Sequence, residues 1–169
     1  MLVRLTPDEI RVACHHAADR YVNALARGAK SKVNVNQPEG RAATDFLSSM
    51  AEMAVSKGLN LYWSGVAGVG AKDVGNQYEI RSTALTHGKL IVSEDDKDDQ
   101  EIVLVICNPP EFKIVGCIYA REGKKDAYRF INPRRGWCWM VPQEKLRRFK
   151  ADQVEQPSSV GENTWLLDL

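Results

Sequence analysis

The sequence lacks the features typical of secreted proteins, of membrane proteins and of proteins stabilised by a structural metal ion. Its 169 residues include four widely spaced cysteines, Cys14, Cys107, Cys117 and Cys138, and no Cys-x-x-Cys pair, so neither a zinc site nor a redox couple is indicated. No apolar run approaches membrane-spanning length, and residues 1–7 lack the basic and apolar segments of a secretory signal. We therefore expect buried free thiols in a soluble cytoplasmic protein.

The chain also lacks a strong net charge, because its formal charge is only +1. The charges are nevertheless segregated: acidic residues concentrate at 94–101, and basic residues at 121–125, 134–135 and 145–150. Folding can gather the basic segments on one face toward a phosphate backbone, or scatter them over the surface. The length fits a single domain that spans residues 1–169.

Helix signals dominate the first third of the chain. Thr6, Pro7 and Glu9 form a capping box with proline at the first helical position, which predicts a helix over 6–28. Residues 29–40 have no apolar period and are predicted to form a loop.

A second helix is predicted over 41–57, with Gly58 as its stop. Glu52 lies off the apolar stripe of this helix. Its carboxylate therefore points either to a neighbouring sheet edge or into water, and we favour the exposed position.

Strand patterns dominate the centre of the chain, with expected strands at 77–83, 89–93, 102–107, 112–119 and 137–141, while 59–63 is either a short strand or an extended exit from the helix. The segment 102–106 is apolar at every position, which is typical of a central strand covered on both faces. With helices as the cover, the pattern predicts an α/β (α+β) fold. A polar tail begins at about 152.

The acidic segment 94–101 has neither the glycine nor the glutamate of a calcium-binding loop. We expect a solvated hairpin turn, and keep open whether Asp95 or Asp96 adds a ligand to a nearby site.

One short stretch carries a candidate site. Asp73 precedes Glu79-x-Arg81, with a turn signal at Gly75-Asn76 between them. Strand alternation places Glu79 and Arg81 on one face. Two carboxylates that converge can hold Mg²⁺. The alternative is that Asp73 caps the turn while Glu79 pairs with Arg81 on a solvated face.

This arrangement resembles the PD-(D/E)xK nuclease superfamily, and in particular small, mostly uncharacterised proteins of tailed phages. The order of elements matches over roughly residues 41–120. The segments that carry the resemblance are Asp73-Val74-Gly75, Tyr78-Glu79-Ile80-Arg81-Ser82-Thr83, Gly88-Lys89-Leu90-Ile91-Val92, Val103-Leu104-Val105, Ile114-Val115-Gly116-Cys117-Ile118 and Val141-Pro142-Gln143.

The resemblance implies a central mixed sheet with the site at one edge, and a nuclease that hydrolyses DNA phosphodiester bonds with Mg²⁺ or Mn²⁺. It implies that Asp73 is the main metal ligand, Glu79 the second, and the backbone carbonyl of Ile80 the third. Glu52 matches the acid on the helix, and Arg81 occupies the lysine position.

Two departures from that family pattern matter. Arg81 replaces lysine, and a guanidinium does not give up its proton in proteins, so Arg81 can stabilise charge but cannot act as a base. Only five residues separate Asp73 from Glu79, which requires a tight turn. The alternative function is therefore a catalytically inactive nuclease-fold module that binds nucleic acid or a host protein.

Arg134, Arg135, Lys124 and Lys125 are the expected contacts to nucleic acid. Arg134-Arg135-Gly136-Trp137 also suits stacking of single-stranded nucleic acid, although we favour core packing for Trp137 and Trp139. DNA is the expected partner, a homodimer and a host protein stay open, and a phage origin implies the host cytoplasm.

Overall fold

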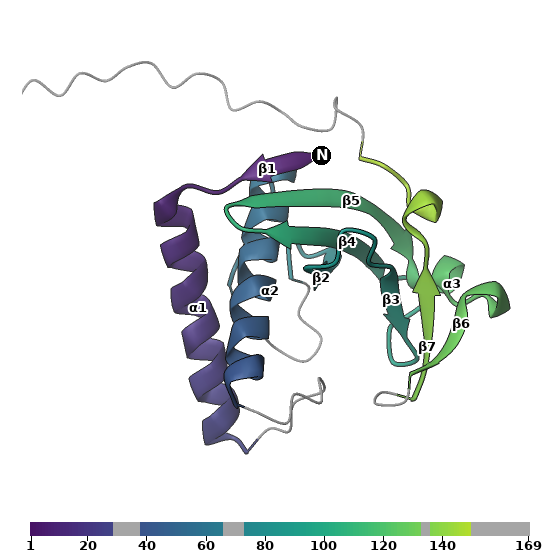
Figure 1. Cartoon of the computed structure of the whole chain (residues 1–169), viewed down its shortest axis with the longest axis horizontal. Helices are drawn as coiled ribbons and strands as arrows, with labels where there is room; N and C mark the ends of the chain where they lie inside the picture. Colours follow the sequence, from purple (N-terminus) through teal and green to yellow (C-terminus); the bar gives the residue numbers. More distant parts are fainter. Residues whose placement is uncertain (29–37, 66–72, 133–135, 150–169) are drawn as a thin grey trace, which may run out of the picture.

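The computed structural model describes residues 1–28, 38–65, 73–132 and 136–149, and it consists of two sheets with two long helices (Figure 1). The helices are α1 (Pro7–Ala26), α2 (Pro38–Leu59) and the short α3 (Ala120–Gly123), and single 3₁₀ turns lie at Asp126–Tyr128 and Gln143–Lys145. The strands are β1 (Leu2–Arg4), β2 (Tyr78–Thr83), β3 (Leu90–Ser93), β4 (Glu101–Asn108), β5 (Glu111–Tyr119), β6 (Arg129–Asn132) and β7 (Gly136–Val141). Within these ranges, no helix has the length and apolar character needed to cross a membrane.

The larger sheet has four strands in the order β1-β5-β4-β2. β2 runs parallel to β4, whereas β4 and β1 are antiparallel to β5. The expected mixed sheet in an α+β fold is therefore confirmed. Because β2 is an outer strand, one of its edges is free of strand partners in this sheet.

β4 is the central strand that its apolar sequence predicts, and its residues 102–107 are all buried. Alternate side chains enter two cores. Val103, Val105 and Cys107 pack with α2 on one face, and Ile102, Leu104 and Ile106 pack on the other. The second face is covered mainly by a three-stranded sheet, β3-β7-β6, rather than by the expected helix layer.

The predicted helix 6–28 is confirmed as α1. The Thr6 side chain accepts a hydrogen bond from the Glu9 backbone at 3.2 Å, and the Glu9 carboxylate accepts one from the Thr6 backbone at 2.6 Å. Gly28 follows with φ +62°, the left-handed conformation that glycine adopts readily.

The second helix is longer than its predicted range of 41–57. α2 begins at Pro38, so the last residues of the predicted loop 29–40 are helical, while 29–37 lie outside the described residues. Gly58 is not the stop, because the helix continues to Leu59 and Asn60 takes the left-handed conformation at φ +52°. Gly58 instead permits close packing, since a Cβ there would lie 2.8 Å from Ile114.

Three other expectations for the fold are wrong or incomplete. Of the two alternatives for 59–63, the strand is wrong, because these residues form none. The segment 94–101 is no hairpin, because it connects β3 of one sheet to β4 of the other. The short strands β1 and β6 were not expected. All four cysteines are free, and all but the half-buried Cys14 are buried. The tail from about 152 lies outside the described residues.

Gly116 marks a bulge in β5. Leu104 pairs with Gly116 and Val105 with Ile114, so Val115 is an extra residue. Next to the bulge, Cys117 and Arg147 exchange two backbone hydrogen bonds of 2.9 Å. A Cβ on Gly116 would lie only 2.4 Å from the Arg147 carbonyl oxygen.

We expect Gly116→Ala to lower the free energy of unfolding by about 1–3 kcal/mol, because the backbone of residue 147 must move away. Chemical denaturation measures the change. Gly28→Ala is the comparison: its Cβ would meet no atom within 4 Å, so its loss, about 1 kcal/mol, reflects only the left-handed conformation at φ +62°. Equal losses in the two variants would contradict the close approach as the cause.

Candidate functional site

The segment before β2 folds back along the free edge of that strand. Gly75 and Asn76 both have left-handed conformations, with φ +60° and +56°, which confirms the predicted tight turn. The Tyr78 N–H donates to the Val74 carbonyl at 3.1 Å, and the Asp73 N–H donates to the Tyr78 carbonyl at 3.0 Å. The turn thus holds Asp73 beside the strand.

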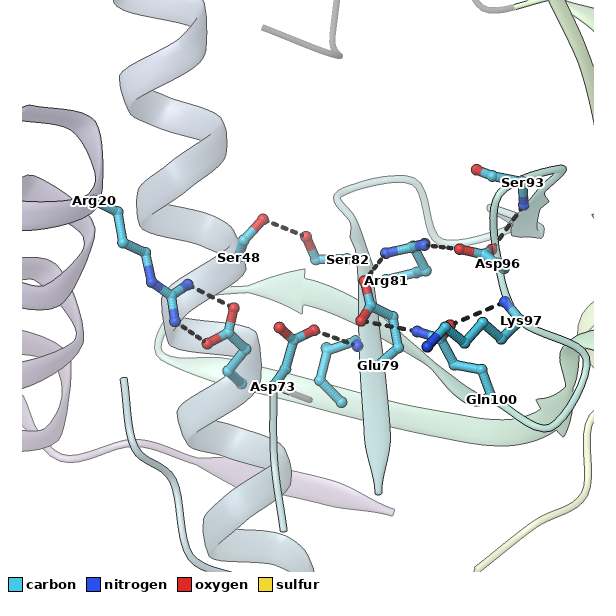
Figure 2. A network of polar contacts seen from close by, with 12 residues as sticks. Arg20, Ser48, Asp73, Glu79, Arg81, Ser82, Ser93, Asp96, Lys97 and Gln100 are labelled. Carbon is cyan, nitrogen blue, oxygen red and sulfur yellow. Dashed lines mark hydrogen bonds and ion pairs between the residues drawn. The ribbon is translucent and has the colours of Figure 1, made fainter. Parts of the chain in front are cut away.

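The Asp73 carboxylate covers part of the free edge. Its Oδ2 accepts a hydrogen bond from the Ile80 N–H at 2.8 Å, which satisfies a backbone donor on an outer strand. In Figure 2 this carboxylate lies between the Arg20 side of the network and Glu79. Asp73 is therefore the central group of the candidate site.

Glu52 approaches from the helix side, and its expected exposure is wrong. The Glu52 residue is only 4% exposed. Arg20 of α1 donates Nη1 and Nη2 to the two carboxylate oxygens at 2.7 and 2.6 Å, and the Trp63 Nε1 donates at 2.8 Å. The sequence alone favours an exposed position because nothing near Glu52 reveals a guanidinium from another helix.

Arg20 connects three segments. Besides Glu52, its Nε donates to the Gly65 carbonyl at 3.1 Å and its Nη1 to the Ser49 hydroxyl at 3.3 Å. His16, one turn earlier on α1, places its ring edge-on to Trp63 with centroids 4.9 Å apart. The pair His16 and Arg20 at helical spacing was the available sequence signal for this contact.

Glu79 and Arg81 share one face of β2, as predicted, and are paired with each other. The other face turns toward α2, where the Ser82 hydroxyl lies 3.3 Å from the Ser48 hydroxyl. Glu79 Oε2 also accepts a hydrogen bond from Gln100 Nε2 at 3.0 Å. Gln100 was not foreseen as part of the site.

Asp96 completes the face of β2 that carries Glu79 and Arg81. It is 8% exposed, its Oδ1 accepts from Arg81 Nη2 at 2.8 Å, and its Oδ2 accepts from the Ser93 N–H at 2.8 Å. The expectation of a solvated acidic turn is therefore wrong at this position. Both oxygens of Asp96 are engaged, and Arg81 is held between two carboxylates (Figure 2).

The electrostatic state of Asp73 reflects its neighbours. The pKa of the Asp73 carboxyl is raised to about 7. Burial is the largest cause, and the negative charges of Glu52 and Glu79 add to it. The Ile80 N–H and Arg20 oppose the increase. Glu52 and Glu79 are therefore both close enough to repel a negative charge on Asp73.

The donor set fits a hard cation in chemistry and charge, because four carboxylates share two guanidiniums across the network. The orientation is less favourable. The oxygens of Glu52 and Glu79 are held by arginines, and in the part of the chain that the structure describes, no group of three or more His, Cys, Asp or Glu residues is placed to hold a metal ion. Metal binding thus requires a glutamate to release its arginine.

Ile80 contributes through its backbone N–H, which binds Asp73. A role for its carbonyl as a metal ligand stays a prediction.

Of the four expected nucleic-acid contacts, Lys124 is bound to the acidic turn that carries Asp96. Lys124 donates its Nζ to the Glu94 carbonyl at 3.3 Å, the Asp96 carbonyl at 2.6 Å and the Asp98 carboxylate at 3.0 Å, so it holds the acidic turn together. Lys125 is exposed. Arg134 and Arg135 lie outside the described residues.

Comparison with models of protein families, with curated proteins and with solved structures gave no match. The resemblance to PD-(D/E)xK nucleases therefore stays a prediction.

We expect Arg20→Ala to lower the free energy of unfolding by about 3–5 kcal/mol, because it leaves Glu52 buried and unpaired. Chemical denaturation measures this loss, and adding Glu52→Gln is expected to restore part of it. Arg11→Ala is the control: its pair with Asp8 is largely exposed and contributes about 0–1 kcal/mol. A similar loss in both single variants would contradict the buried pair as the source.

The Asp73 pKa predicts a pH dependence of stability. Between the ordinary value of 3.8 and about 7, the folded protein holds a proton that the unfolded chain has released. The free energy of unfolding therefore falls as the pH rises through this window, by about 1.4 kcal/mol per pH unit for this group, and levels off above it.

Asp73→Asn keeps an acceptor for the Ile80 N–H but removes this titration. We expect the variant to be more stable than the native protein above about pH 7, with the difference shrinking toward about pH 4. Parallel denaturation series across this range measure it. A difference that does not change with pH would refute the raised pKa.

Proposed function

We propose that the chain is a Mg²⁺-dependent nuclease that hydrolyses phosphodiester bonds in DNA. One observation carries the proposal: the Asp73 carboxyl, at the free edge of β2, is close enough to Glu52 and Glu79 for their charges to help raise its pKa to about 7. A half-buried group of carboxylates with too few cations attracts a divalent ion.

Asp73 and Glu79 are the residues that would hold the ion, with Glu52 as a third carboxylate nearby. When bound, Mg²⁺ polarises the scissile phosphate and lowers the pKa of an attacking water. Arg81, once released by Glu79, donates hydrogen bonds to phosphate oxygens and stabilises their growing charge. It cannot accept a proton. A proton on Asp73 competes with the cation, so cutting is expected to increase as the pH rises through about 7.

A second candidate is a catalytically inactive module of the same fold that binds nucleic acid or a host protein. The observation in its favour is that both guanidiniums are already used: Arg20 takes both oxygens of Glu52, and Arg81 lies between Glu79 and Asp96. Charge in this network is thus partly neutralised without a metal ion.

We expect purified protein to cut linear, branched or single-stranded DNA with Mg²⁺ or Mn²⁺. Asp73→Asn and Glu79→Gln should each slow cutting by at least about 100-fold, because each removes a charged ligand. Gel electrophoresis of the products measures the rates. Glu111→Gln, which affects only an exposed pair with Arg4 on β1, is the control and should cut normally.

Binding of the ion can be measured without turnover. Mg²⁺ should raise the midpoint of thermal unfolding of the native protein and not that of Asp73→Asn, because a ligand that binds only the folded state stabilises it. If no DNA is cut and Mg²⁺ has no effect, the nuclease proposal fails. Salt-sensitive DNA binding in that case supports the inactive module, and its absence leaves only a protein partner.

A further inference from the structure

The hairpin of β6 and β7 presents large apolar side chains to solvent. Trp137 is 47% exposed and Ile131 is 57% exposed. The two residues pair directly across the strands, so their side chains lie on one face. Core packing of Trp137, which the sequence favours, is therefore wrong, whereas Trp139 packs against the buried cluster as expected.

The exposure of Trp137 follows from strand lengths. β3 ends at Ser93, which pairs with Cys138 of β7. Beyond that point, among the described residues, the sheet has only two strands, and the row that holds Trp137 and Ile131 has no third strand beside it. This end of the hairpin extends past the core, and its aromatic ring lacks the cover that Trp139 receives.

A cation lies against the exposed ring. The guanidinium carbon of Arg129 is 4.2 Å from the centroid of Trp137. Within the described part of the chain, Arg129 makes no ion pair with a carboxylate. Its charge is therefore available to an anionic ligand.

We propose that the exposed hairpin end, formed by Arg129, Ile131 and Trp137, binds single-stranded nucleic acid. A ligand that carries flat apolar surfaces and negative charge at short spacing matches an exposed indole beside a guanidinium that no carboxylate of the described residues pairs with. Bases stack on aromatic rings and on guanidinium planes, and each stacked base contributes substantially to affinity regardless of sequence. Arg129 also contacts the adjoining phosphate.

In Figure 1 the hairpin of β6 and β7 lies on the side of the molecule opposite α1 and α2. The inference rests on the proposed function for the class of ligand but not for cleavage, because Arg129, Ile131 and Trp137 are not among the residues that would hold the metal ion.

Nearby negative charge limits the electrostatic contribution. The acidic segment 94–101 follows Ser93 directly, and although Lys124 pairs with Asp98, Glu94 and Asp95 are exposed. We therefore expect stacking to dominate binding. The logarithm of affinity should fall with the logarithm of salt concentration with a slope of only about −0.7, the value for one phosphate contact on a single strand.

The test is fluorescence anisotropy of a labelled oligodeoxythymidine of about 12 nucleotides, in EDTA so that no cutting occurs. We expect Trp137→Ala to weaken binding about 5- to 100-fold and Trp137→Phe to stay within about 3-fold of the native protein. Arg129→Gln should reduce the salt slope toward zero. Leu2→Ala is the control and should bind normally. It truncates a 68% exposed side chain on β1, an outer strand of the four-stranded sheet to which the hairpin does not belong.

Three results would overturn the proposal: no binding of the oligonucleotide, equal affinity in Trp137→Ala and the native protein, or equal weakening in the alanine and phenylalanine variants. Light scattering on the same samples identifies a second copy as the occupant if Trp137→Ala dissociates an oligomer and leaves affinity unchanged. If Trp137→Ala unfolds, Trp137→Phe and Arg129→Gln decide the outcome. Binding in EDTA with no cutting in Mg²⁺ would leave this site standing and reject the nuclease.

Discussion

The ion pair between Arg20 and Glu52 is the contact on which the candidate site depends. It connects α1 to α2 and, through the Gly65 carbonyl, to the segment that follows α2. Because Glu52 is almost fully buried, its charge is tolerable only with a guanidinium in contact. The same pair places a negative group beside Asp73, which is one reason why the Asp73 carboxyl holds its proton more tightly than usual.

The two faces of β2 have a common design. Arg20 lies on the helix face, where it pairs with Glu52, and Arg81 lies on the opposite face, where it pairs with Glu79 and Asp96. Asp73 lies at the strand edge between them, where its carboxylate accepts a hydrogen bond from the Ile80 N–H (Figure 2). The two proposed functions differ in what balances Asp73: a divalent cation in the nuclease, and a proton near neutral pH in the inactive module.

Local patterns in the sequence predicted the local features of the fold. The capping box of Thr6 and Glu9, the two-sided strand at 102–107 and the turn at Gly75-Asn76 were all correct, because each depends on residues that are neighbours in the chain. The stop at Gly58 and the hairpin at 94–101 were wrong. Gly58 packs closely against the Ile114 side chain of β5, and the acidic segment connects two sheets. Neither feature is decided by residues nearby in the sequence.

For the site, the sequence by itself determined that Glu79 and Arg81 share a face and that Asp73 lies close to them, since strand alternation and a five-residue spacing leave little freedom. Only the tertiary structure decided which charges meet. Arg20, Asp96 and Gln100 come from elements distant in the chain, and the exposure of Trp137 depends on where β3 ends. Pairing between distant segments produces no periodic pattern in the sequence of either segment. From the sequence alone, each charged side chain is equally compatible with a solvated position, and only packing decides which ones lose their water and need a partner.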